Sequence, residues 1–230
     1  MAKRIYLSPS SQTANTYAAG NTNEAAQCRK IALAAKAALE RCGFEAKTNV
    51  TAGKSMYDRV RESNAWDADL HVPIHTNAFN KKLKGTRMFC SSLTGEGGKA
   101  CKAILATLAP IVDGDSDNVQ TADFYEITAS NAPCAYVEAA FHDNAEQAAW
   151  IIAHVVDIGE AICKGICNHY GVKYVAPAAA AEKQPEESSK TNVFYRVQVG
   201  AFNERKNAEK MHDELKAKGY DSAFIVEVTR

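Results

Sequence analysis

The sequence has no surplus of charge and no long apolar run. Lysine and arginine together number 27 among 230 residues, and so do aspartate and glutamate, so the formal net charge is zero. A balanced chain lacks the electrostatic attraction by which nucleic acids and anionic membrane surfaces hold their proteins, so we expect no nucleic-acid partner and no membrane partner. No segment approaches the roughly 18 consecutive apolar residues that a membrane-spanning helix needs.

The N-terminus also lacks the apolar stretch of a secretory signal. Met1-Ala2-Lys3-Arg4 leads directly into the strand-like segment 5–7, which leaves no room for such a stretch. We therefore expect a protein that is synthesised in the cytoplasm without a signal peptide.

The cysteines form no C-x-x-C pair, and their number, seven, is odd. Neither a disulfide framework nor a metal cluster is therefore favoured. Cys163 and Cys167 lie four residues apart on a predicted helix, where packing is the simplest interpretation. We predict reduced thiols, most of them buried.

Residues 1–174 alternate strand-like and helix-like segments, which is the pattern of an α/β fold. We predict a mixed, mainly parallel sheet that is flanked by helices. The predicted strands are 5–7, 44–48, 68–75, 86–90, 124–127 and 135–141. The predicted helices are 23–41, 55–66 with a Ser55-x-x-Asp58 capping pattern, 98–112, and 145–170 with a break near 157–159.

A change of composition separates this domain from the C-terminal part of the chain. Residues 175–190, VAPAAAAEKQPEESSK, are rich in Ala, Pro, Glu and Ser and have almost no large apolar side chain. Such a segment cannot offset the entropy of ordering, so we predict a flexible linker. Residues 191–230 predict a small βαβ unit with strands at 194–201 and 223–228 and a helix at 204–218.

Three residues could carry chemistry in the first domain. The predicted central strand ends in His75-Thr76-Asn77, and open α/β sheets place their active sites at such strand ends. Glu24 lies in the first turn of a predicted helix, a position that the helix dipole alone would favour. Glu138 lies in an apolar strand, where an unpaired carboxylate is costly and a functional role is the better explanation. One histidine, one carboxylate ligand and one carboxylate base are the parts of zinc hydrolases.

Four segments, in order and with comparable spacing, resemble the zinc-dependent N-acetylmuramoyl-L-alanine amidases of the type 3 family. These enzymes cut peptidoglycan between the sugar and its stem peptide. The matching segments are IYLSP at 5–9, NE at 23–24, ADL at 68–70 with IHTNA at 74–78, and PCAYVE at 133–138 followed by Phe141. The resemblance covers about three quarters of the chain.

The resemblance implies that Glu24 and His75 are zinc ligands and that Glu138 is the catalytic glutamate. Zinc would polarise the lactyl carbonyl and lower the pKa of a water molecule towards neutrality. Glu138 would take the proton of that water and return it to the departing alanine nitrogen. The cofactor implied is zinc, and the implied partner is peptidoglycan.

The chain departs from the family at the first zinc ligand. That ligand is a histidine in the loop after the first strand, and the loop 8–22 contains none here. Three alternatives stay open: an amide oxygen of Gln12 or Asn15 replaces it, His142 replaces it, or the metal site is impaired. The last alternative would make the protein a non-catalytic cell-wall-binding protein. His71 is about 13 Å along the strand from His75, too far to share a metal, and is expected to be a core or cleft histidine.

The C-terminal unit resembles a sporulation-related repeat (SPOR) domain, a module that binds peptidoglycan glycan strands. The matching segments are YRVQVGAF at 195–202, NAE at 207–209 and KGY at 218–220. They cover about half of the usual pair of βαβ repeats, so the unit could pair with a second copy and form a homodimer. Together the two resemblances predict an endolysin-like peptidoglycan hydrolase that acts on the cell wall after release.

Overall fold

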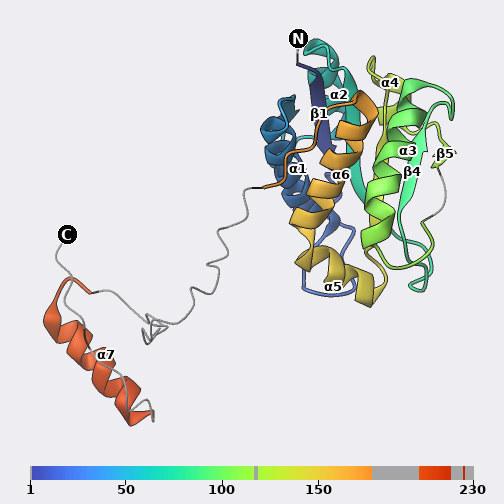
Figure 1. Cartoon of the computed structure of the whole chain (residues 1–230). Coiled ribbons are helices and arrows are strands. Elements are labelled where there is room, and N and C mark those ends of the chain that lie inside the picture. The colour runs from blue at the N-terminus through green and yellow to red at the C-terminus, as the bar shows by residue number, and fades with distance from the viewer. Residues whose placement is uncertain (1, 117–118, 178–201, 219–224, 226–230) are drawn as a thin grey trace, which may run out of the picture. The chain divides into compact units, whose positions relative to one another are not determined.

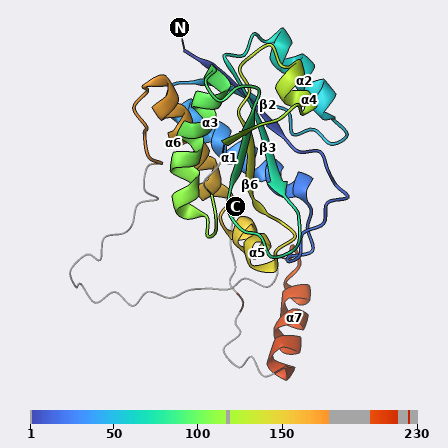
Figure 2. The same cartoon turned by 90° about the vertical axis from the view of Figure 1, so that its right-hand side faces the viewer.

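The structure is a computed structural model that describes residues 2–116, 119–177, 202–218 and 225. The chain divides into two compact units, Met1–Ala181 and Glu182–Arg230. The strands, labelled in Figures 1 and 2, are β1 (Arg4–Pro9), β2 (Glu45–Thr48), β3 (Leu70–Asn77), β4 (Arg87–Cys90), β5 (Val119–Thr121) and β6 (Tyr136–Phe141). The helices are α1 (Glu24–Arg41), α2 (Met56–Ala65), α3 (Glu96–Leu108), the 3₁₀ turn η1 (Ala109–Ile111), α4 (Tyr125–Ala129), α5 (Ala145–Ala153), α6 (Val155–Tyr170) and α7 (Arg205–Ala217).

The six strands of the first unit form one sheet in the order β2-β1-β3-β6-β4-β5. All neighbours pair in parallel except β4 and β6, which are antiparallel. The helices α1, α3 and α6 cover one face of the sheet, and α2 and α4 lie on the other (Figure 2). The prediction of a mixed, mainly parallel sheet flanked by helices is therefore confirmed.

The central strand β3 separates the main core from a second, polar layer. Because side chains alternate across a strand, Leu70, Val72 and Ile74 enter the apolar core beneath α1, α3 and α6. His71 and His75 point to the opposite face, towards α2 and α4, and are also buried. The strand is therefore buried on both faces, but the two faces differ in chemistry.

Two helix starts follow directly from local sequence. Asn23 caps α1 through its side chain, which accepts a hydrogen bond from the backbone N–H of Ala26, and this makes Glu24 the first helical residue. The predicted capping box of α2 is also present, because the Ser55 and Asp58 side chains each accept from the backbone N–H of the other residue.

Three predictions of secondary structure are corrected. The segment 124–127, predicted as a strand, is instead the start of α4, because an apolar run this short does not distinguish a strand from one helical turn. The break between α5 and α6 lies at His154 rather than near 157–159. Gly159 lies inside α6, where a Cβ atom would come within 2.7 Å of the Ala34 Cβ, so it permits close packing on α1. The short strand β5 was not predicted.

All seven cysteines are buried and free, as predicted. The helix predicted over 204–218 is confirmed as α7. The strands predicted over 194–201 and 223–228, residue 225 apart, lie outside the described residues, and so does most of the segment 175–190. No helix among the described residues has the length and apolar character needed to cross a membrane.

Candidate active site

The three predicted residues meet at the carboxyl end of the central parallel strands. His75 and Glu138 are direct neighbours in the register of β3 and β6, so their side chains share one face of the sheet. Glu24 reaches them from the start of α1, and its Oε1 lies 2.8 Å from His75 Nδ1. Strands and a helix start that are far apart in sequence therefore bring one imidazole and two carboxylates together.

Two amide side chains complete this cluster. Gln12 Nε2 lies 3.3 Å from His75 Nδ1. Asn15 Nδ2 donates to Glu24 Oε2 at 2.6 Å and to Gln12 Oε1 at 2.9 Å. The loop after β1 thus supplies two oxygen-bearing groups where the family pattern has a histidine.

His142, the third alternative, has different neighbours. Its Nδ1 lies 3.0 Å from the Thr76 Oγ1 and 2.8 Å from the Thr76 carbonyl oxygen, and its ring stacks on Tyr17. Thr76 follows His75 in β3, so the two side chains point to opposite faces of the strand. The contacts of His142 therefore lie away from the Glu24–His75 pair.

Glu126 belongs to the site and was missed as a site residue in the sequence. Its Oε2 lies 3.5 Å from His75 Nε2, and its Oε1 lies 3.3 Å from His71 Nε2. It also accepts a hydrogen bond from the Ser8 hydroxyl. The available signal was a carboxylate in an otherwise apolar segment, the same signal that singled out Glu138. Because 124–127 was predicted as a strand, the contacts of Glu126 with the two histidines were not expected.

The charges of the cluster are set by these contacts. Burial favours the neutral form of His75, but its contacts with Glu126 and Glu24 outweigh burial and raise the pKa of His75 to about 10. Burial also favours the protonated form of Glu126, yet its hydrogen bond to His71 and its ion pair with His75 lower the pKa of Glu126 to about 2. The pKa of Glu24 is likewise lowered by His75 despite burial. Without a metal ion, His75 is therefore a cation held between two carboxylates.

Glu138 has the opposite character. Its Oε2 is buried and has no hydrogen-bond partner among the described residues. Burial raises the pKa of Glu138 to about 8, while His75 partly offsets this effect and Glu24 adds to it. The surroundings of these two carboxylates drive their pKa values apart, which indicates different roles. Glu126 is fixed as an anion, whereas Glu138 can exchange a proton near neutrality.

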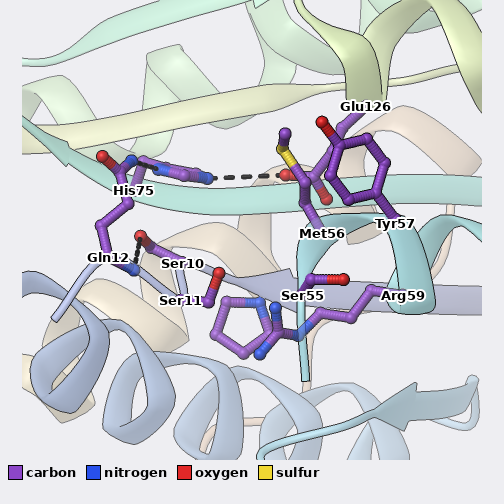
Figure 3. A pocket seen from close by; sticks show the side chains of 10 residues that line it. Ser10, Ser11, Gln12, Ser55, Met56, Tyr57, Arg59, His75 and Glu126 are labelled. Carbon is purple, nitrogen blue, oxygen red and sulfur yellow. Dashed lines mark hydrogen bonds and ion pairs between the residues drawn. The ribbon is translucent and has the colours of Figure 1, made fainter. Parts of the chain in front are cut away.

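A pocket of about 420 Å³ opens beside this cluster. Figure 3 shows His75 and Glu126 at its inner side, with Gln12 on one flank and Tyr57 and Arg59 of α2 on the other. The Arg59 side chain is fully buried, and its Nε donates to the Asn49 carbonyl at 3.1 Å. The size and the mixture of aromatic and polar groups are those of a ligand-binding cleft.

The donor set around Glu24 and His75 is compatible with zinc. Two ligands of a tetrahedral zinc ion at about 2.0–2.1 Å lie roughly 3.3 Å apart, so the 2.8 Å pair needs only a small separation. A 180° rotation of the Gln12 amide would present its oxygen in place of Nε2 at the same point. Glu126 faces the other ring nitrogen, as the carboxylate partners of zinc-bound histidines do.

Comparison with known proteins assigns the family. A family model described as N-acetylmuramoyl-L-alanine amidase matches residues 8–168, which is more than half of the chain. The chain belongs to the N-acetylmuramoyl-L-alanine amidase family. A second model, described as SPOR domain, matches residues 187–230.

A protein of similar sequence and two solved structures of similar fold are also named as amidases. The sporulation-specific N-acetylmuramoyl-L-alanine amidase of Bacillus subtilis is 24% identical over 234 residues, covering 97% of this chain and 84% of that protein. Among solved structures, the amidase AmiC2 of Nostoc punctiforme superposes with a TM-score of 0.67 at 18% identity, covering 74% of this chain and 97% of that one. The catalytic domain of CwlV from Paenibacillus polymyxa var. colistinus has a TM-score of 0.66 at 16% identity, covering 74% and 99%.

These findings confirm the prediction of a peptidoglycan amidase with a SPOR domain. The non-catalytic alternative is not favoured. The amidase family match includes Glu24, His75, Glu126 and Glu138, all within residues 8–168.

Proposed function

We propose that this amidase is zinc-dependent and cleaves the amide bond between N-acetylmuramic acid and L-alanine with Glu24 and His75 as zinc ligands and Glu138 as the catalytic residue. The observation that carries the proposal is the buried Oε2 of Glu138, unpartnered among the described residues and beside the Glu24–His75 pair. A costly buried carboxylate at a cleft is explained if a substrate or water completes its contacts.

Zinc held there would supply Lewis acidity towards the scissile carbonyl and a lowered pKa for the attacking water. Glu138, in its carboxylate form, accepts a proton from that water as the oxygen attacks the lactyl carbonyl carbon. It then donates the proton to the alanine nitrogen as the C–N bond breaks, because an amide nitrogen leaves poorly unless it is protonated. The products are a lactyl carboxylate on the sugar and a free amine on an intact stem peptide.

The oxygen donor that replaces the missing histidine comes from Gln12 or Asn15 in this proposal. Both side chains already contact the Glu24–His75 pair, whereas the contacts of His142 are with Thr76 and Tyr17. An amide oxygen is a harder and weaker ligand for zinc than an imidazole. We therefore expect lower zinc affinity than a site with two histidines would have.

Glu126 acts as a positioning residue rather than as a ligand or base. It faces the ring nitrogen of His75 that lies away from Glu24, and it is fixed in turn by His71 and Ser8. This arrangement sets the tautomer and the orientation of His75.

The C-terminal part of the chain would carry the enzyme to its substrate. A SPOR domain that binds glycan strands would raise the local concentration of the catalytic domain at the insoluble wall. Pairing of two short SPOR units into a homodimer, and release to the wall after cytoplasmic synthesis, as endolysins are released, remain part of the proposal.

The test is an analysis of the new chain ends that purified enzyme creates in isolated peptidoglycan. We expect free L-alanine amines on intact stem peptides, and no amines deeper in the stem, which a peptidase would create. His75→Ala should abolish this product and lower bound zinc by one equivalent per chain, whereas His154→Ala, which alters a histidine stacked on Trp150, should do neither. Unchanged zinc content in His75→Ala, or new amines only within the stem, would contradict the proposal.

A further inference from the structure

Three thiols converge at the end of α1 that is remote from the active site. Cys42 is the C-terminal cap of α1, and Cys163 and Cys167 lie four residues apart on one face of α6. The Sγ of Cys163 lies 3.7 Å from that of Cys42 and 4.0 Å from that of Cys167. All three side chains are buried.

The spacing is that of a tetrahedral metal site. Zinc–thiolate bonds of about 2.3 Å at tetrahedral angles place the sulfur atoms roughly 3.8 Å apart, between the two separations above. The three sulfur atoms all lie within 4.8 Å of one another, and no other trio of His, Cys, Asp or Glu in the described part of the chain is so close. We propose that Cys42, Cys163 and Cys167 bind one zinc ion, with solvent at the fourth position. This site is separate from the catalytic centre.

A backbone amide and a guanidinium lie beside the three thiols. The backbone N–H of Val175 donates to the Cys42 sulfur at 3.3 Å, and the Val175 carbonyl oxygen lies 3.8 Å from that sulfur. The guanidinium of Arg41 is anchored on the Val175 carbonyl at 2.9 Å and on Glu160 at 2.6 Å, and its charge acts on Cys167. Three thiolates and a zinc ion carry one net negative charge, and this guanidinium, which is also paired with Glu160, offsets part of it.

Metal uptake at this cluster must release protons. Burial raises the pKa of Cys163 well above its usual range and that of Cys167 to about 11, so these two thiols are neutral in the metal-free protein. Each thiol that binds zinc gives its proton to the solvent, so binding should strengthen as pH rises. The bound ion would tie the end of α1 to α6 beside Val175.

The two metal sites can be tested independently. Glu24 begins α1 and Cys42 follows its end, so an 18-residue helix of about 27 Å separates them. Thiolate ligands also give cobalt(II) an intense near-ultraviolet charge-transfer absorption that imidazole and carboxylate ligands do not. A cobalt signal of this kind therefore reports the cysteine cluster whether or not the proposed active-site zinc exists.

The experiment is a cobalt(II) titration of the full chain after metal removal, with all thiols kept reduced. We expect the thiolate absorption to saturate at one equivalent and to disappear when zinc is added. Cys163→Ala and Cys167→Ala should lose the absorption, whereas His75→Ala should keep it. The matched control is Cys101→Ala, because Cys101 is equally buried but its sulfur contacts the Phe89 carbonyl rather than the cluster.

Zinc content provides the second readout. The wild-type chain should hold two zinc ions, and Cys163→Ala and His75→Ala should each hold one. The cobalt titration of the wild-type chain tests the proposal by itself. Its result therefore stays valid even if a variant misfolds. The proposal is overturned if folded, fully reduced wild-type protein shows no thiolate–cobalt absorption, or if both cluster variants retain it. In the first case the three thiols serve only to pack α1 against α6.

Discussion

Replacing Glu138 by glutamine should abolish catalysis and at the same time remove a pH-dependent cost in stability. The substitution keeps the shape of the side chain but removes its ability to carry a proton from water to the leaving nitrogen. Since general acid–base catalysis contributes about 10²–10⁴-fold, we expect kcat to fall by that factor, with zinc content unchanged.

The effect on stability follows from the raised pKa of Glu138. In the metal-free protein this pKa is about 8 instead of 4.5, so the folded state keeps its proton while the unfolded state loses it. Between these two values stability falls as pH rises, by about 1.4 kcal/mol per pH unit, or about 3 kcal/mol between pH 4.5 and 7. Because Glu138 retains some solvent exposure, we expect roughly half of this. Glutamine does not titrate, so the variant should escape this loss.

The assay is urea unfolding of metal-free wild type and Glu138→Gln at several pH values, together with the rate of product formation by the zinc-loaded proteins. The difference in unfolding free energy should shift in favour of the variant by about 1–3 kcal/mol from pH 4.5 to 7. Glu146→Gln is the control, because Glu146 is largely exposed and contacts Lys84. Parallel stability curves, or a loss of kcat below tenfold, would refute the reasoning for Glu138.

Two further predictions concern the support of the site and of the fold. Glu126→Gln should weaken zinc binding by about 10–100-fold by removing the carboxylate partner of His75, and excess zinc should restore part of the activity; unchanged affinity in a zinc titration would exclude this positioning role. Gly159→Ala should lower the unfolding free energy by about 1–3 kcal/mol, because its Cβ would lie 2.7 Å from the Ala34 Cβ. Thermal unfolding measures this, and a melting temperature equal to that of Lys164→Ala, an exposed site on the same helix, would contradict it.

Local signals in the sequence determined much of the first domain. The Ser55-x-x-Asp58 capping pattern predicted the start of α2, because a cap depends only on residues within one turn. The alternation of strand-like and helix-like segments predicted an α/β fold. A carboxylate in an apolar strand, Glu138, and a histidine at a strand end, His75, were identified because each conflicts with its surroundings.

Only the tertiary structure decided which residues act together. The parallel register of β3 and β6 sets Glu138 beside His75, and the start of α1 brings Glu24 to the same imidazole. Glu126 joined the site because α4 is a helix, which a segment of four residues could not reveal. Cys42 lies 121 residues from Cys163, and nothing local to either thiol indicates the other. Side-chain direction and the contacts of distant elements depend on packing, and packing is a property of the whole fold.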